Sequence, residues 1–318
     1  MARVTLHPSW IGRRLLLGLG QTAAVVLFIF ALTEALPGDA AVALAGDQPD
    51  PARIARIRET MGLDRPAAER LVDWVSGLLH GDLGTSLVSG RPVTGYLTAG
   101  LGPTLLLAAA TLSLLVPLAV GLGVLAARRE GGPLDRTVSA LTLAVHAVPE
   151  FAVGVLLATL FGLWLAWLPP TAVGADPFTE PAVLVLPVVV LLSRPVCTIS
   201  RLVRAGMIDA MASPYVAQAR RYGVSGARVT WTHALPNALA PATQQLARTC
   251  DWLLSGVIVV EALFVIPGLG TVLIEAVAAR DIPVVQGMAV VFGIVTVAVN
   301  LAADLVARRF APRSEVAA

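Results

Sequence analysis

The chain has 318 residues, of which 56% are hydrophobic and 14% are charged, and its formal net charge is +2. A soluble domain of this size carries about 25% charged residues, so this is not the composition of an ordinary soluble domain. Apolar runs of about 20 residues recur along the chain and predict an all-α, polytopic membrane protein. The sequence contains no lysine, which excludes a phosphate-binding loop of the G-x-x-x-x-G-K-[ST] type and ATP hydrolysis by that route.

The first apolar run covers about residues 15–32 and follows Arg3, Arg13 and Arg14. A basic start and an apolar core also describe a secretory signal peptide. No small-x-small cleavage site comes before residues 34–39, and more apolar runs follow. The sequence therefore predicts an uncleaved first transmembrane helix whose N-terminus is cytoplasmic.

Residues 34–97 form the longest polar region of the chain. Within it, residues 50–59 and 69–79 alternate apolar and polar positions with the period of an amphipathic helix. The topology places this region outside the membrane, where we expect a small helical subdomain. A solvated cap that binds no partner is the plainer interpretation, because amphipathic helices usually only cover a core.

Five further transmembrane helices are expected, at about residues 103–127, 137–168, 183–204, 238–260 and 284–306. The third is long enough to be tilted or to be kinked at Pro149. The external stretch between the last two spans, Glu261 to Asp281, is expected to hold a short helix. The short loops predicted to be cytoplasmic are rich in arginine, so both termini are placed inside. The predicted regions are residues 1–33 (first helix), 34–97 (external subdomain) and 98–318 (five-helix core), the last containing a cytoplasmic loop at 205–237.

A polar, basic stretch at residues 213–241 separates the fourth and fifth spans. Ser213 followed by Pro214 is typical of a helix N-cap with proline at the first helical position. The sequence predicts a helix over residues 214–222 that ends at Gly223, and a second short helix from Ser225 that stops before Pro236. We call residues 213–237 the cytoplasmic hook.

Polar side chains at membrane depth are costly unless they are paired or wetted, so they are the candidates for a translocation path. The candidates are His146, Glu150, Arg194, Arg248 and Asp251. His146 and Glu150 are four residues apart, which predicts one helical face, and Arg248 and Asp251 are close enough in sequence to pair. One interpretation is a water-accessible path whose mixed charges suit a zwitterionic solute such as a short peptide. The other is that Glu150–Arg194 and Arg248–Asp251 are neutralised pairs that hold helices together.

Enzyme and metal signatures are weak. No H-E-x-x-H pattern or G-x-S-x-G elbow is present, so we predict neither catalytic residues nor a metal site. Cys197 and Cys250 have no metal-type or C-x-x-C spacing, and a buried apolar role is expected for both.

Two short motifs resemble a known family. The spacing of Ala217-Gln-Ala219, Gly223 and Leu235-Pro236 resembles the cytoplasmic "EAA" loop of ABC-importer permeases. The amino-acid sequence of residues 215–223 and 233–238 is similar to that of the dipeptide/oligopeptide/nickel branch. Segments at 36–39, 62–66 and 81–86 also resemble that branch. The sequence departs from the family at Ala217, where the motif is acidic, and at Arg221-Tyr222, where a small residue and a lysine are usual.

The resemblance implies a permease subunit of a bacterial ABC importer in the cytoplasmic (inner) membrane, forming half of a path for short peptides. It implies a second, similar permease, two ATPase subunits that carry ATP and magnesium, an extracytoplasmic solute-binding protein and no nucleic acid; this chain itself would bind no cofactor. The hook would be the ATPase-coupling loop, with contacts from Tyr215, Ala217, Ala219, Arg220, Gly223, His233, Leu235 and Pro236. Alternatives are the same machinery for nickel or another small solute, or a stand-alone channel or secondary transporter.

Overall fold

The computed structural model describes residues 8–35, 41–42, 50–62 and 64–310, and for some residues in the helices it describes the backbone alone. In these residues the regular structure is helical apart from one isolated bridge between Thr85 and Pro92. The predicted all-α class is therefore confirmed. The chain divides into two compact units, one built around residues 105–266 and the other around residues 8–104 and 267–298.

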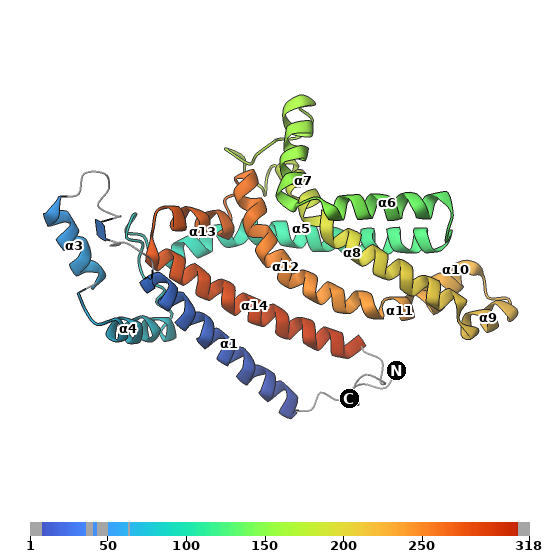
Figure 1. Cartoon of the computed structure of the whole chain (residues 1–318), viewed down its shortest axis with the longest axis horizontal. Helices are drawn as coiled ribbons and strands as arrows, with labels where there is room; N and C mark the ends of the chain where they lie inside the picture. The colour runs from blue at the N-terminus through green and yellow to red at the C-terminus, as the bar shows by residue number, and fades with distance from the viewer. Residues whose placement is uncertain (1–7, 36–40, 43–49, 63, 311–318) are drawn as a thin grey trace. The chain divides into compact units, whose positions relative to one another are not determined.

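The unit around residues 105–266 holds the long helices of the core (Figure 1). Its elements are α5 (Val93–Ala127), which enters from the other unit, α6 (Pro133–Ala147), α7 (Glu150–Leu157) with the π-helical η1 (Ala158–Trp164), the 3-10 turn η2 (Pro181–Leu184), α8 (Val185–Ala212), α9 (Pro214–Arg221), α10 (Gly226–Arg228), the π-helical η3 (Val229–Ala234), α11 (Leu235–Ala238) and α12 (Ala240–Phe264).

Helix α8 is the centre of this unit. Helices α6, α7, α11 and α12 all pack against it, and its buried side chains include Val190, Leu191, Val203 and Met207, each 0% exposed. A helix that is apolar on most faces is buried by neighbours on most faces. Cys197, on α8, is buried and free, as expected for a small apolar residue.

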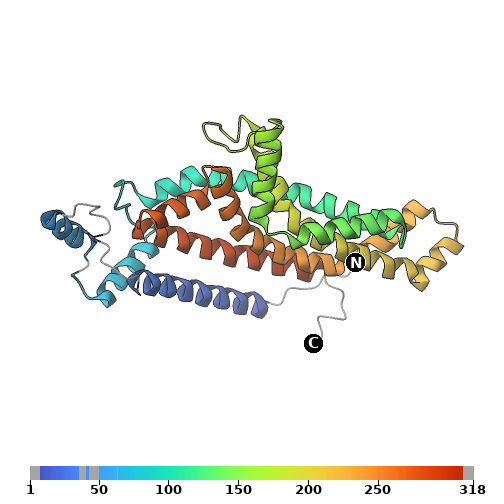
Figure 2. The same cartoon turned by 45° about the horizontal axis from the view of Figure 1, so that its top comes forward.

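The predicted third span is broken. Helices α6 and α7 meet at 102°, and Figure 2 shows α7 standing across the direction of α6. The break falls at Val148, whose backbone is extended, and Pro149. Proline lacks the N–H that would continue the helix and excludes helical geometry at the residue before it. The expected kink at Pro149 is therefore confirmed.

The same break corrects the prediction that His146 and Glu150 share one helical face. His146 lies in the last turn of α6 and Glu150 begins α7. The four-residue spacing places side chains together only where the helix is continuous, and here it is not.

The second unit contains α1 (Pro8–Ala35), α3 (Pro51–Met61), α4 (Ala67–Leu79), the start of α5, α13 (Leu269–Ala278) and most of α14 (Ile282–Phe310). Helices α3 and α4 occupy the two stretches predicted to be amphipathic. The α3 helix is capped by Asp50, whose side chain accepts a hydrogen bond from the Ala52 N–H at 3.0 Å. Helices α1 and α14 approach closely at glycines, since a Cβ on Gly18 would lie 2.8 Å from Val297 and one on Gly293 would lie 3.0 Å from Val25.

Helix α13 is the short helix expected between the last two spans, and both of its ends are tied to this unit. The Leu269 N–H at its start donates to Thr104 Oγ1 at 2.9 Å. Just beyond its end, the buried carboxylate of Asp281 accepts from Ser86 Oγ at 2.5 Å and from the Leu87 N–H at 3.1 Å. These bonds fix the loop at residues 84–92 against the end of α13.

By length and composition, the described residues contain four helices that can cross a membrane, or up to six if each of two bent pairs is one span. The bent pairs are α6 with α7–η1 and the end of α12 with α13. The multi-pass character is confirmed, and the count of six remains a prediction.

The contact between α5 and α8 yields a test with a matched control. A Cβ on Gly123 would lie 2.7 Å from both the Ser200 carbonyl oxygen and Val203 Cβ, whereas a Cβ on Gly121 would meet nothing within 4 Å. We expect G123A to lower the free energy of unfolding by about 1–3 kcal/mol, because the helices must move apart. G121A should be neutral or raise stability by up to about 1 kcal/mol, the helical advantage of alanine. Thermal unfolding in detergent measures both, and equal melting temperatures for the two variants would contradict the close packing.

Candidate functional site

The cytoplasmic hook forms as two helical pieces. Helix α9 occupies residues 214–221, close to the predicted 214–222, and Gly223 follows with φ +76°, the left-handed conformation that glycine adopts without strain. Ser213 stands at the N-cap position, but its side chain does not cap α9. Its hydroxyl instead donates to the Ala210 carbonyl of α8 at 2.5 Å. The predicted N-cap hydrogen bond to α9 was therefore wrong, because the Ser213 hydroxyl bonds to the end of the preceding helix.

The prediction that the second piece stops before Pro236 was wrong. It runs from α10 through the π-helical η3 into α11, where Pro236 is the second residue. The backbone hydrogen-bond pattern changes from π-helical to α-helical at the junction of η3 and α11. Proline is tolerated at Pro236 because the backbone N–H groups in the first turn of a helical segment need no partner within that segment. The polypeptide therefore returns to α12 as nearly continuous helix.

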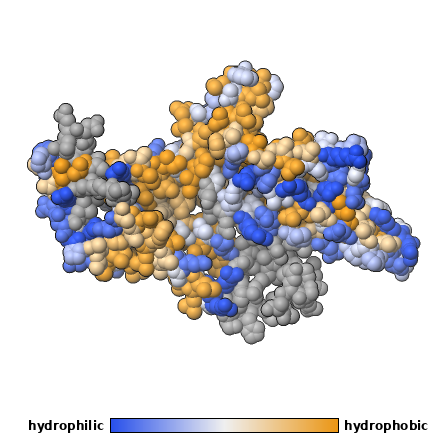
Figure 3. Space-filling model, viewed as in Figure 1, coloured by the Kyte–Doolittle hydropathy of each residue, from blue (hydrophilic) through white to orange (hydrophobic). Residues whose placement is uncertain are grey.

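Helix α9 is anchored by one buried side chain, and most of its other side chains are exposed. Val216 is 0% exposed within the main core cluster, whereas Tyr215, Ala217 and Arg220 are exposed and Ala219 is half-buried. Figure 3 shows the end that carries α9 and α10 as largely hydrophilic, in contrast to the apolar surface over α7. The hook thus presents a short polar helix outside the apolar body of its unit.

The returning piece is held to α9 by a side-chain bond. Asn237 Nδ2 donates to the Tyr215 hydroxyl at 2.9 Å and to the His233 carbonyl at 3.2 Å. Leu235 is buried, His233 is half-buried and Pro236 is exposed. The structure therefore brings the predicted coupling-loop residues into one small assembly of α9, η3 and α11.

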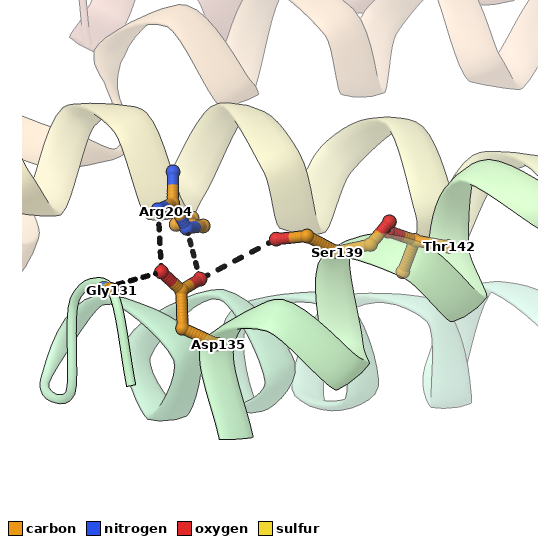
Figure 4. Close-up of polar contacts among 5 residues, drawn as sticks. All are labelled: Gly131, Asp135, Ser139, Thr142 and Arg204. Atoms are coloured by element: carbon orange, nitrogen blue, oxygen red, sulfur yellow. Dashed lines mark hydrogen bonds and ion pairs between the residues drawn. The ribbon is translucent and has the colours of Figure 1, made fainter. Parts of the chain in front are cut away.

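Above the hook, an ion pair joins α8 to the start of α6 (Figure 4). Arg204 donates from Nε to Asp135 Oδ1 at 2.5 Å and from a terminal nitrogen to Oδ2 at 2.7 Å. The Gly131 N–H donates to Oδ2 at 2.9 Å, and the Ser139 hydroxyl lies 3.4 Å from Oδ1. Such a two-pronged guanidinium–carboxylate pair fixes orientation as well as distance.

Asp135 precedes the predicted third span and is only 3% exposed. The Arg204 guanidinium, and after it the Gly131 amide, hold the pKa of the Asp135 carboxyl well below its usual range. The carboxylate is therefore ionised at neutral pH, and the contact is a full ion pair.

The polar residues predicted at membrane depth are partly brought together. Glu150 Oε1 and His146 Nδ1 are both buried, and neither atom has a hydrogen-bond partner within the described part of the chain. Arg194, on α8, is close enough to interact electrostatically with both groups. Glu150 and Arg194 nevertheless form no ion pair of 4 Å or less among the described residues, so the neutralised Glu150–Arg194 pair is not formed in this conformation.

The α12 candidates are less informative. Arg248 is exposed, and the side chain of Asp251 lies outside the described residues. The proposed Arg248–Asp251 pair thus stays a prediction. An arginine placed at the centre of a lipid-facing helix costs about 2.5–3.5 kcal/mol on insertion scales, so the exposed Arg194 and Arg248 call for a polar environment.

Sequence reasoning missed three interactions of this site: the Asp135–Arg204 ion pair, the Tyr215–Asn237 hydrogen bond and the electrostatic interaction of Arg201 with His146. The first two join residues 69 and 22 positions apart in the chain, and no local pattern encodes such distances. The third had a signal, because Arg194 and Arg201 are seven residues apart and share a helical face.

Comparisons with known proteins identify the class. Residues 119–316 match the model of the binding-protein-dependent transport system inner membrane component, and residues 10–98 match the N-terminal model of the same transport systems. The chain belongs to this family. It is therefore a multi-pass inner-membrane permease subunit of an ABC transporter, which works with ATPase and substrate-binding partners and is not itself an enzyme.

Relatives within the family are similar over nearly the whole chain. A putative peptide transport system permease protein of Brucella abortus is 35% identical over 88% of this chain and 90% of its own length. A probable peptide ABC transporter permease protein of Sinorhizobium fredii is 33% identical over 96% and 98%. The glutathione transport system permease protein GsiC of Pectobacterium atrosepticum is 35% identical over 91% and 94%.

The Tyr215–Asn237 bond predicts a selective effect of removing one hydroxyl. Y215F should weaken the contact between α9 and α11 by about 0.5–1.5 kcal/mol, the net contribution of a typical hydrogen bond. We expect slower ATP-driven uptake with ATP hydrolysis less affected. Y222F is the matched control, because Tyr222 is 78% exposed and no hydrogen bond of its hydroxyl is found in the described structure. Equal uptake by the two variants would argue against a role for the bond.

The Asp135–Arg204 pair predicts a loss of stability on neutralisation. D135N keeps the shape of the side chain but cannot accept two charge-assisted bonds, so it leaves Arg204 without its counter-charge. We expect a lower melting temperature in detergent for D135N than for D209N, since Asp209 is exposed on α8. If D135N and D209N have the same melting temperature, the Asp135–Arg204 ion pair contributes no stability.

Proposed function

We propose that this chain is one of two permease subunits of an ATP-driven importer of short peptides. The observation that carries the proposal is α9, a short exposed helix anchored through Val216 and tied by Tyr215 to α11. It lies at the end of α8, the most extensively packed span of its unit (Figure 1). An exposed polar helix fixed to the end of a buried span is suited to receive a force from outside the membrane.

Three contacts join the end of α8 and the hook, so that they can move together as a rigid unit. Asp135 clamps Arg204 from α6, and a Cβ on Gly206 would lie 2.6 Å from the Ala238 carbonyl oxygen of α11. The Tyr215–Asn237 bond completes the frame. Packed elements move as units, so a displacement of α9 is passed to α6, α8 and α12 together.

The proposed assembly contains this chain, a second similar permease, two ATPase subunits and an extracytoplasmic solute-binding protein. Both termini and the hook are cytoplasmic in this proposal, and residues 34–97 are external. ATP-driven closure of the ATPases would push the hooks and rock the two permeases around a shared path. Short peptides are the proposed cargo, supported by the peptide transport names of the Brucella and Sinorhizobium relatives.

The test is whether α9 binds the ATPase. Ala217 is exposed on α9, so A217W adds a large side chain without disturbing the core. We expect A217W to abolish co-purification of the ATPase with the tagged chain and ATP-driven uptake of a labelled tripeptide. The melting temperature of the variant chain should be unchanged.

R128W is the control, because Arg128 is exposed in the turn between α5 and α6. It adds the same side chain to a different loop on the same predicted side and should leave both assays unchanged. An A217W chain that still retains the ATPase and supports uptake would overturn the assignment of α9 as the coupling element.

A further inference from the structure

Arg194 belongs to a polar stripe on α8. The residues at helical spacings of three and four along one exposed or half-exposed face are Arg194, Thr198, Arg201, Ala205 and Asp209. The opposite faces of α8 are buried, and their buried residues include Pro195, Ile199 and Val203. The stripe is thus an exposed to half-buried face of α8, and it carries two arginines.

The arginines lie at different depths. Arg194 is about 15 Å of helix before the predicted end of the span at residue 204, which is half of a hydrocarbon core about 30 Å thick. Arg201 is about 10 Å nearer the cytoplasm. A guanidinium at the membrane midplane that is exposed on its own subunit requires water or an anion beside it.

The neighbouring groups do not neutralise the stripe. Glu150 lies on α7, with its Oε1 atom buried and 3.3 Å from the Cβ position of Gly256 on α12. The charged group near Glu150 is Arg194, with which it interacts electrostatically but forms no ion pair among the described residues. His146, on α6, interacts electrostatically with Arg201 and Arg194. Asp209, the other acidic member of the stripe, lies beyond the predicted end of the span at residue 204. Within the span the stripe therefore carries two guanidinium groups, and only Arg194 has a carboxylate, that of Glu150, close enough for an electrostatic interaction.

We infer that the α8 stripe is an anion-selecting wall of the translocation path, on which Arg194 and then Arg201 hold a carboxylate of the solute. This inference rests on the proposed function, because it takes α8 to line the path. The substrate class follows: the solute carries a free carboxylate, as the C-terminus of a peptide does. A guanidinium binds a carboxylate through two parallel hydrogen bonds, which gives the path an orientation as well as a charge preference.

Thr198, between the two arginines, is the position for a test that needs no knowledge of the cargo. Cysteine would be placed there (T198C) in a chain carrying C197A and C250A, within the assembled complex in membranes. The probes are two water-soluble methanethiosulfonates, one bearing a sulfonate and one a trimethylammonium group. Each rate of modification is divided by the rate of the same reagent with a small free thiol, with and without ATP.

We expect the anionic reagent to be favoured at least tenfold after this normalisation, and R194Q combined with R201Q to remove the preference. V189C is the control for α8, because Val189 is exposed but lies nine residues earlier and therefore on the opposite face. It should react with neither reagent.

Failure of T198C to react in either nucleotide state would overturn the inference, since this face of α8 would then contact lipid or another subunit and not water. Equal normalised rates, a preference for the cation, or equal reactivity of V189C would overturn it as well. The outcome is separate from the proposed function, because modification of the cysteine requires neither binding of the ATPase to α9 nor uptake.

Discussion

The rest of this structure depends on the close packing of the C-terminal half of α8. Gly123 lets α5 approach the backbone at Ser200, and Gly206 lets α11 approach within contact of the same helix. Small residues have this role in membrane proteins because lipid provides little hydrophobic force between helices, and association relies on intimate contact. The ion pair of Arg204 with Asp135 is directional, so it fixes the rotation of α6 relative to α8, which packing alone does not.

This arrangement explains why a short helix of eight residues can keep a defined position at the edge of its unit. Isolated helices of that length are unstable in water. Helix α9 is held because Val216 enters the core, because the chain joins it directly to α8, and because Tyr215 is hydrogen-bonded to Asn237 of α11. The order of α9 is thus supplied by the body to which it is attached, which is the property required of an element that transmits displacement.

The sequence predicted the helical class, the amphipathic α3 and α4, the short α13 and the hook with its Gly223, because each has a local signal in periodicity, composition or a single special residue. It did not predict that the third span turns through 102° or that Pro236 lies within a helix. Proline marks a position where a helix can change, but whether it kinks, ends or restarts there is decided by the hydrogen bonds of its neighbours. The pairs Asp135–Arg204 and Tyr215–Asn237 are tertiary, and the local patterns in the sequence do not reveal them.

The absence of lysine has a consequence for the charge of the α8 stripe. A lysine ammonium moved into an apolar environment readily gives up its proton, and its pKa can fall by several units. A guanidinium does not, because its charge is delocalised and its pKa stays above about 12. The two differ in shape as well, because a guanidinium presents parallel N–H donors in a fixed plane and an ammonium is a point charge. A stripe that carries arginine and no lysine can therefore select a bound anion by its planar shape as well as by its charge.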